Sequence, residues 1–313
     1  MTFEITEPIL VIGLGRVGAD LAEKAKKSLN SDSLMISHDQ KDLTGENSIK
    51  ISTKSVVNPS IHLIRGSTLE NLEEIEKNIS KYSTIILMSN LAGKAGIGIA
   101  PVVSKICKEQ EKNLLSFAIM PFKFEKDRIF QSGIALKRIR HDSHCTIVLD
   151  NDALLDSNPD LSHEQCNNIS NKAIESVISS LKSSEISEDV NILSTSKNAS
   201  DMEVSLKDSL RMLYEDAPPN SIKRSMLYVY GGSNVPIGVL NSISDITGGV
   251  FDENTTHVDM SSNESKIVML SSVQGEIKFD KYDPLGIISS EKTIDWDEPE
   301  CSINCELDLK QLE

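Results

Sequence analysis

The sequence is poor in aromatic residues, which make up 4% of its 313 residues, and it contains a single Trp. Its five cysteines are odd in number and scattered, so we expect no disulfide framework and a reducing cytoplasm. No apolar run approaches the ~20 residues of a membrane-spanning helix. The start, MTFEITEP, has none of the features of a signal peptide. These absences predict a cytoplasmic protein without a membrane span.

Basic residues are also in deficit, because 32 Lys and Arg face 47 Asp and Glu and the formal net charge is −15. A chain of this charge argues against a nucleic-acid-binding surface. The apolar and charged fractions, 39% and 25%, are those of an ordinary globular protein. The length is enough for about two domains, each with its own core.

The stretch ILVIGLGRVGADLAEKA, at residues 9–25, contains the pattern G-x-G-x-x-G at Gly13, Gly15 and Gly18 between an apolar strand and a helix. Glycines allow a tight turn and close approach of a ligand, and a helix N-terminus favours an anion. Asp39 follows at roughly the 20-residue distance expected of a ribose-binding acid in NAD proteins. By itself the motif leaves open NAD, another nucleotide, or a ligand-free turn.

Apolar strands alternate with amphipathic helices through residue 180 or so, which predicts a Rossmann-like parallel sheet. A helix is expected from about Thr68, with Ser67 and Glu70 at capping-box spacing. Another is expected around residues 128–139, and a long one over residues 163–181 that joins two halves. Residues 183–201 are polar and indicate a loop between the halves. The strands and helices that follow predict a second, α+β domain.

The predicted organisation has four parts. Residues 1–162 form a nucleotide-binding domain, 163–183 a central linking helix, 184–281 a C-terminal α+β domain, and 282–313 a flexible acidic tail. The tail prediction is based on composition, since residues 291–313 contain eight acids and two lysines.

Several motifs, in this order along the chain, resemble those of the tubulin/FtsZ family, and the archaeal type within it. NPS at residues 58–60 resembles the family's NPE, and AGKAGIG at residues 92–98 lies where the family has GGGTGTG. PFKFE at residues 121–125 resembles PFxFE, and ND followed by LL at residues 151–155 resembles PNDxLL. LYVYGGSNVPIGVLNSISDIT resembles a strand, glycine pair and helix of the family's C-terminal domain. The resemblance implies the tubulin/FtsZ architecture, guanine nucleotide binding and a role in cell division or the cytoskeleton.

The resemblance also implies which residues bind GTP or GDP, with Mg²⁺ accompanying GTP. Two glycine turns would hold the phosphates, while Asp39 takes the place of an acid in the family's NTDxQAL. Glu125 and Arg128 resemble residues near the ribose and phosphate, and Asn151 and Asn168 fall near the guanine-reading positions. The residues of the two glycine turns are Gly13, Gly15, Arg16, Gly18, Gly93, Lys94, Gly96 and Gly98.

The chain departs from the family in its second glycine turn, where Ala95 and Ile97 replace both threonines and Lys94 replaces a glycine. Asn168 stands where the family usually has Asp, and Glu164 where a Phe is expected to stack on the base. Both changes predict weaker base selection.

The hydrolysis loop also departs from the family. In the family, a loop at the bottom of one subunit inserts two acids into the next subunit's nucleotide site. Its counterpart here is taken as residues 191–196, where Asn191, Leu193 and Ser196 form a degenerate loop without either acid. A leucine cannot polarise water. Asp189 or Asp201 would be the acid if the alignment is shifted. We therefore expect no confident catalytic residue, and weak or absent GTP hydrolysis.

Implied partners are a second copy of the chain or an FtsZ homologue, and a membrane-anchor protein that binds the acidic tail. No metal site is expected. Two alternatives stay open: a NAD-binding regulator or dehydrogenase, and a nucleotide-free structural paralogue that modulates a true FtsZ.

Overall fold

The computed structural model describes residues 2–54, 57–181, 186–197, 201–231, 236–251, 253–259 and 266–282. The predicted acidic tail, 282–313, lies outside these ranges except for its first residue. So do residues 183–185 and 198–200 of the predicted inter-domain loop, and residues 182–183 of the predicted linking helix. No helix among the described residues is long and apolar enough to cross a bilayer.

The N-terminal half is the predicted parallel sheet, with strand order β4-β3-β2-β5-β6-β7. The strands are β2 (Ile9–Leu14), β3 (Asp32–Ser37), β4 (Ser48–Lys50), β5 (Thr84–Asn90), β6 (Asn113–Met120) and β7 (Cys145–Asp150). Because β3 lies on one side of β2 and β5 on the other, the strand order reverses between β2 and β5. Ligands of such sheets bind at this switch point, outside the carboxyl ends of the strands.

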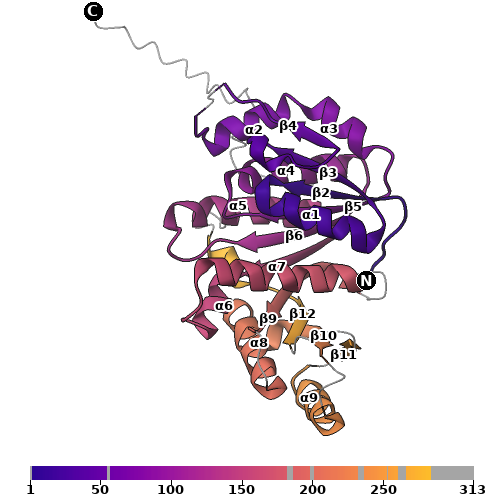
Figure 1. Cartoon of the computed structure of the whole chain (residues 1–313), viewed down its shortest axis with the longest axis vertical. Coiled ribbons are helices and arrows are strands. Elements are labelled where there is room, and N and C mark those ends of the chain that lie inside the picture. Colours follow the sequence, from indigo (N-terminus) through magenta and orange to yellow (C-terminus); the bar gives the residue numbers. More distant parts are fainter. Residues whose placement is uncertain are drawn as a thin grey trace, which may run out of the picture.

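Helices cover both faces of the sheet, as Figure 1 shows. The apolar side chains of α1 (Gly15–Leu29), α6 (Asn151–Ser157) and α7 (His163–Ser180) share one core cluster. The opposite core cluster contains α2 (Ile61–Leu69), α3 (Leu72–Ile79), α4 (Lys94–Glu109), α5 (Lys126–Asp142) and most of the apolar residues of α8 (Met202–Asp216). The sheet is therefore buried on both sides, which explains the nearly continuous apolar character of its strands.

The strands after α7 continue the same sheet. They are β9 (Asp189–Thr195), β10 (Ile222–Tyr230), β11 (Glu253–Asp259) and β12 (Lys266–Val273), and β9 pairs with β7. The full order is β11-β10-β12-β9-β7-β6-β5-β2-β3-β4. A further pair, β1 (Thr2–Phe3) with β8 (Ile186–Ser187), joins the N-terminus to the connection between α7 and β9. The two predicted halves therefore share one sheet, with α7 on its face.

The prediction of a helix start at Ser67 with a Glu70 capping box is wrong. Ser67 lies inside α2, which begins after Ser60, and the Ser60 hydroxyl accepts a hydrogen bond from the Leu63 amide at 3.3 Å. Glu70 follows the last residue of α2. The spacing of Ser67 and Glu70 matches a capping box, but both residues lie near the junction of two short helices, α2 and α3, which are separated by only Glu70 and Asn71.

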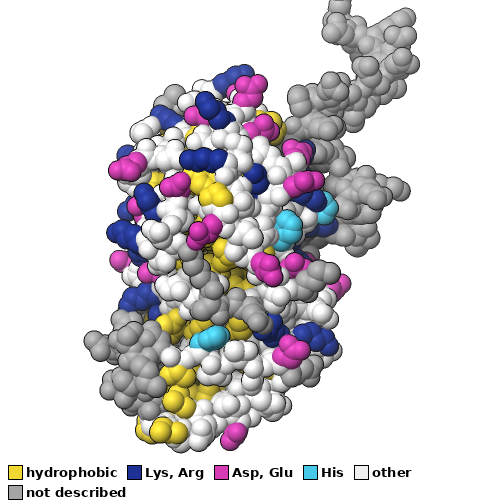
Figure 2. Space-filling model, turned by 90° about the vertical axis from the view of Figure 1, so that its right-hand side faces the viewer, with side chains coloured by type: hydrophobic (Ala, Val, Ile, Leu, Met, Phe, Trp, Pro, Cys, Tyr) yellow, Lys and Arg dark blue, Asp and Glu magenta, His cyan; other side chains and the backbone are white. Residues whose placement is uncertain are grey.

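The last helix, α9 (Ile237–Val250), packs at the far end of the sheet from β4. Ile237 is 76% exposed, and Ile246 and Val250 are also exposed. Figure 2 shows hydrophobic side chains on the surface at this end of the molecule. The isoleucines of this helix are thus buried only in part, at Ile243.

Candidate functional site

The first glycine turn joins β2 to α1 with no residue between them. Gly15 has φ +64, in the left-handed region that favours glycine. A Cβ on Gly13 would lie 2.4 Å from the carbonyl oxygen of Gly18, and a Cβ on Gly18 would lie 2.5 Å from that of Met88. The turn is therefore packed against itself and β5, and α1 starts directly at the carboxyl edge of the sheet.

The second glycine turn follows β5 and leads into α4. Neither α1 nor α4 has a side-chain N-cap, since Leu14 and Gly93 occupy the cap positions. The first amides of both helices therefore lack the side-chain acceptor that α2, α6, α7 and α8 receive from Ser60, Asp150, Ser162 and Asp201. Uncapped helix N-termini favour anions such as phosphate.

The two turns face each other across the switch point. A Cβ on Gly15 would lie 3.0 Å from the Cβ of Ala95, at the start of α4. Arg16, the second residue of α1, is exposed. Lys94 points elsewhere, since its Nζ donates to Asn58 Oδ1 at 2.6 Å and to the Pro59 carbonyl at 2.8 Å. Lys94 thus ties the NPS loop to the second turn.

Gly96 and Gly98 lie inside α4 and are packing glycines. A Cβ on Gly96 would lie 2.1 Å from the carbonyl oxygen of Asn90, and one on Gly98 would lie 3.0 Å from Ile64 Cγ2. Gly96 therefore lets α4 approach the end of β5, and Gly98 lets it approach α2. Gly93 and the first residues of α4 lie closer to the space between the turns than Gly98 does.

The acid beside the first turn is Asp42. Its Oδ2 would lie 3.9 Å from a Cβ on Gly15, and it accepts a hydrogen bond from the Ser37 hydroxyl at 2.7 Å. Asp39, the predicted ribose acid, is exposed and accepts the Lys41 amide at 3.0 Å. Partial burial lowers the pKa of His38, while the charges of Asp42 and Asp39 act in the opposite direction. Of these two acids, the structure therefore places Asp42 beside Gly15 and leaves Asp39 exposed.

Glu125 and Arg128 hold the second turn from the β6 side. Arg128 Nη1 donates to the Ala92 carbonyl oxygen and lies 3.3 Å from Glu125 Oε1. Glu125 Oε2 accepts the Phe122 amide at 3.2 Å. Arg128 and Glu125 therefore join the PFKFE motif to the second glycine turn.

Asn151 is 2% exposed and is the first residue of α6. Its Oδ1 accepts the Ser170 hydroxyl at 2.5 Å, and its Nδ2 donates to Asn167 Oδ1 at 3.3 Å. The neighbour of Asn151 on α7 is thus Asn167. Asn168 is exposed and lines a cavity of about 300 Å³ with Gln165 and Ile169, away from the glycine turns. The structure does not bring Asn168 to the other predicted site residues.

An aromatic cluster that the sequence reading missed lies between the PFKFE motif and α7. Phe122 and Phe124 stack with ring centroids 5.3 Å apart, and His163 lies 5.0 Å from Phe122. Phe124 is 66% exposed, and the Asn167 side chain lies 3.2 Å from His163 Nδ1. The signal was present in the sequence, since His163 is four residues before Asn167 and on the same helix face.

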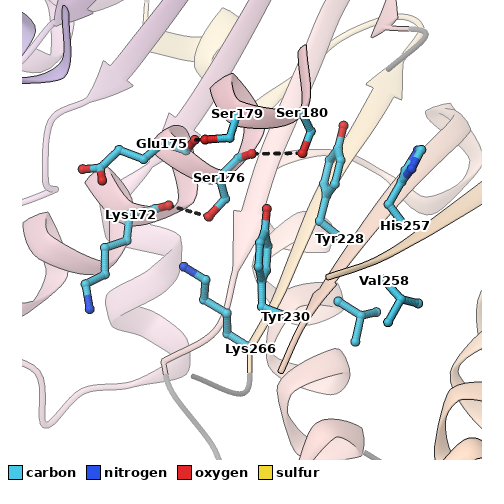
Figure 3. Close-up of a pocket in the computed structure, with 11 residues that line it drawn as sticks. Lys172, Glu175, Ser176, Ser179, Ser180, Tyr228, Tyr230, His257, Val258 and Lys266 are labelled. Atoms are coloured by element: carbon cyan, nitrogen blue, oxygen red, sulfur yellow. Dashed lines mark hydrogen bonds between the residues drawn. The ribbon is translucent and has the colours of Figure 1, made fainter. Parts of the chain in front are cut away.

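A second cavity, of about 650 Å³, lies on the side of α7 turned away from Asn167 (Figure 3). Lys172 and Lys266 line both this cavity and the first one. Figure 3 shows Lys172, Ser176 and Ser179 of α7 opposite Tyr228 and Tyr230 of β10. On a helix with 3.6 residues per turn, these α7 positions point away from Asn167. This cavity is therefore separate from the glycine turns.

The prediction that residues 191–196 form a hydrolysis loop is wrong. Asn191 and Leu193 lie within β9, which pairs with β7 on one side and β12 on the other, and Ser196 follows it. All three are buried, at 1%, 0% and 1% exposure. Because β9 runs parallel to β7, its end lies at the same carboxyl edge as the glycine turns. The segment is therefore a core strand of the sheet and not an exposed loop.

The two alternative acids lie at different edges. Asp189 begins β9 at the amino edge, opposite the glycine turns, where it pairs in register with Cys145. Asp201 caps α8, and its Oδ1 accepts the amides of Glu203 and Val204 at 2.9 and 3.4 Å. Asp201 therefore has a structural role in the described chain.

Behind Asn151 lies a buried charged cluster. Lys278 begins the short helix η5 (Lys278–Tyr282) and lies 2.5 Å from Asp150 Oδ2 and 3.3 Å from Asp216 Oδ1. Both carboxylates are fully buried. Burial, and next the charge of Asp150, raise the pKa of Asp216 well above its ordinary value. Asp216 is therefore harder to ionise than an exposed aspartate.

This pKa predicts a pH-dependent stability that Asp216→Asn removes. A carboxyl whose pKa is raised on folding stabilises most below its unfolded pKa of about 4 and loses that contribution as pH rises through the folded value. The free energy of unfolding of the wild type should therefore fall, relative to the variant, as pH increases above about 4. Urea unfolding of both chains between pH 4 and 8 measures the difference. A constant difference across that range would contradict the assignment.

Paired glycine turns at the switch point of a doubly wound sheet define an α/β protein of the nucleotide-binding class. Residues 8–159 match the family model described as Tubulin/FtsZ family, GTPase domain. The cell division protein FtsZ 2 of Halobacterium salinarum is 29% identical over 165 residues, 49% of this chain and 41% of that protein. FtsZ 2 of Haloferax volcanii is 36% identical over 77 residues, 25% of this chain and 19% of that protein. The matched region thus spans less than half of these relatives.

Solved structures show the same fold across most of the chain. An empty FtsZ dimer of M. jannaschii has a TM-score of 0.68 at 15% identity and covers 89% of this chain and 92% of that chain. GDP-bound monomeric CetZ1 of Haloferax volcanii has a TM-score of 0.67 at 14% identity and covers 89% and 98%. Residues 8–159 therefore belong to the tubulin/FtsZ family as a divergent, FtsZ-like domain, and the chain as a whole has the fold of FtsZ and CetZ. The predicted family and architecture are therefore confirmed.

Proposed function

We propose that the chain binds a guanine nucleotide at the carboxyl edge of its sheet. In this proposal it assembles with itself or with an FtsZ homologue. It hydrolyses GTP weakly or not at all. The observation that supports binding is the pair of uncapped helix N-termini, α1 and α4, that face each other at the switch point. A solved relative with the same fold is described as GDP bound, which favours a guanine nucleotide over NAD.

In this proposal the phosphates lie at the amides of the two glycine turns, with Asp42 beside them. The base lies toward Asn151 and the aromatic cluster of Phe122, Phe124 and His163, at the ends of β6 and β7. Among the described residues, no group of three or more His, Cys, Asp or Glu could hold a metal ion by itself. Any Mg²⁺ would therefore be bound mainly by nucleotide phosphates and water.

Weak hydrolysis follows from the connection at the opposite end of the subunit. The chain leaves α7 and reaches β9 within eight residues, 181–188, and part of that connection is β8, paired with β1. Phe3 and Ile186 are paired in register and buried. A connection held against the subunit's own N-terminus is poorly placed to enter a neighbour's site. Glu188 and Asp189 are the described acids there.

Titration with a fluorescent GDP analogue tests nucleotide binding. We expect saturable binding that GDP and GTP displace and NADH does not. Phe124→Ala should weaken binding by about tenfold, since stacking of a base on an aromatic ring contributes roughly 1–3 kcal/mol. Phe130→Ala, which removes another partly exposed Phe from α5, is the control and should have little effect. Binding of NADH alone would reject the proposal, and no binding of either ligand would favour the nucleotide-free paralogue.

GTP turnover per protein should stay near background as protein concentration rises. Asp201→Asn keeps a good helix N-cap, because Asn and Asp are equivalent there, but removes the charge. We expect no change in turnover for this variant. A rate that climbs steeply with concentration, and that Asp201→Asn or Glu188→Gln abolishes, would show that a catalytic acid exists.

Assembly is tested by sedimentation with GTP. The chain should pellet alone or together with an FtsZ homologue, and the GDP sample is the control. Failure to pellet in either mixture would leave nucleotide binding as the proposed activity and reject assembly. Attachment to a membrane-anchor protein through residues 282–313 is a further proposal, tested by whether removal of these residues abolishes co-sedimentation with that anchor.

A further inference from the structure

Asp150 divides its two carboxylate oxygens between two tasks. Its Oδ1 accepts the Asp152 amide at 2.9 Å and so caps α6, and its Oδ2 accepts a hydrogen bond from Lys278 at 2.5 Å. The first residue of the capped helix is Asn151, whose side chain joins α6 to α7. One buried carboxylate therefore connects η5 to the base side of the proposed nucleotide site.

Asp152 extends the connection to the PFKFE motif. Its Oδ1 accepts the amide of Lys123 at 3.1 Å, and the ammonium of Lys123 lies 2.8 Å from its Oδ2. Lys123 lies between Phe122 and Phe124 in the sequence. The N-terminus of α6, which Asp150 caps, therefore positions both Asn151, the contact of Asn167, and the aromatic cluster.

Lys278 is well suited to hold this arrangement. Its side chain is 18% exposed, and it satisfies two carboxylates that are fully buried. A buried carboxylate that loses its cation is costly, because an unpaired charge then stays in a low-dielectric interior. Arg140 of α5 fixes the same segment, since its Nη1 lies 2.5 Å from Asp280 Oδ1.

We infer that Lys278 is a positioning residue of the nucleotide site, which couples the segment preceding the acidic stretch to the base side through Asp150 and the N-terminus of α6. A change in η5, such as a partner's pull on the residues after Tyr282, then alters nucleotide affinity without touching the ligand. Conversely, an occupied base site favours the docked position of η5, because such coupling is reciprocal. The ligand part of this inference rests on the proposed function.

Hydrogen exchange of the α6 amides tests the connection in the absence of nucleotide. Lys278→Met should accelerate exchange of the Asp152 amide at least tenfold. Lys281→Met, an exposed lysine in the same short helix with the same charge change, is the control and should alter it less than twofold. Unchanged exchange in Lys278→Met would overturn the inference.

Affinity for the fluorescent GDP analogue tests the coupling. Lys278→Met should weaken binding at least tenfold, while Lys281→Met stays within twofold of the wild type. Lys278→Arg, which keeps a cation, should stay within threefold. All variants are compared at a temperature where they are folded. A general loss of stability would then not produce this pattern, in which Lys278→Met alone binds weakly and Lys278→Arg restores binding. Equal effects of the substitutions at 278 and 281 would overturn the inference.

Asp150→Asn supplies a variant that keeps the cap and removes the charge, since Asn is an equally good N-cap. In this background Lys278→Met should change analogue affinity less than twofold, because its effect acts through Asp150. A full tenfold effect in the Asp150→Asn chain would show another route and overturn the inference. If the Lys278→Met chain does not fold, Asp150→Asn alone carries the test and should weaken binding at least threefold, whereas an affinity within twofold would overturn it.

The two proposals fail separately. If the wild type binds no guanine nucleotide, the proposed function is rejected, and the exchange experiment still decides whether Lys278 controls α6. If the wild type binds the analogue and Lys278→Met binds it equally well, the proposed function stands and the coupling is rejected.

Discussion

Gly96→Ala is expected to destabilise the protein by about 3 kcal/mol, at the upper end of what overpacking of a core costs. The added methyl would lie 2.1 Å from the carbonyl oxygen of Asn90 and 2.7 Å from its carbonyl carbon. Both atoms belong to the backbone at the end of β5, which pairs with β6 and cannot move aside cheaply. Either α4 must shift away from the sheet or the end of β5 must distort. Urea denaturation, followed by circular dichroism, measures the loss.

Gly93→Ala in the same turn is the matched control. Gly93 has extended backbone, φ −96 and ψ 145, and its added Cβ would lie 3.4 Å from the Asn90 oxygen. We expect a change of less than about 1 kcal/mol, as for most substitutions outside a packed core. Its effect should appear instead as weaker nucleotide binding, because the methyl lies beside the uncapped amides of α4. Equal destabilisation by the two substitutions would contradict the distinction between a packing glycine and a site glycine.

The parallel sheet could be predicted because its strands are buried on both faces and interrupted by glycine turns. Residues 84–89 and 145–150 are apolar runs of strand length, and each is followed by a turn and a helix. The ordered motifs located the carboxyl edge for the same reason, since a turn after each strand must lie there. Local sequence information was sufficient for these features.

Strand β9 could not be predicted in the same way. Its sequence, DVNILST, contains four polar and three apolar residues, yet Asn191, Ser194 and Thr195 are buried between β7 and β12. Asn191 is accommodated because its Nδ2 donates to the Ser187 carbonyl oxygen at 2.9 Å. Such burial depends on partners distant in sequence, and a polar strand in the middle of a sheet therefore resembles a loop.

Within the site, the structure differs from the sequence expectation by one and by three residues. Asn167 and Asn168 differ by 100° around α7, so only the packing of α6 decides which one meets Asn151. Asp39 and Asp42 share one short loop, and the hydrogen bond from the Ser37 hydroxyl holds Asp42 near Gly15. The partner of Lys94 lies 36 residues earlier, at Asn58. Sequence spacing thus predicts which helix or loop carries a site residue, but it does not predict which side of that helix or loop faces the site.

Leu193→Ala is expected to lower the free energy of unfolding by roughly 2–5 kcal/mol, the usual cost of truncating a fully buried Leu. Leu193 is 0% exposed, and it lies opposite Leu270 of β12 in register. Leu63→Ala on α2 is the control, because Leu63 is 42% exposed, and it should cost less than about 1 kcal/mol. If residues 191–196 were an exposed loop that enters a neighbour's site, Leu193→Ala would instead leave stability unchanged and alter assembly or turnover. Unfolding curves for the two variants, together with sedimentation and GTP turnover of the folded chains, separate a core strand from a contact loop.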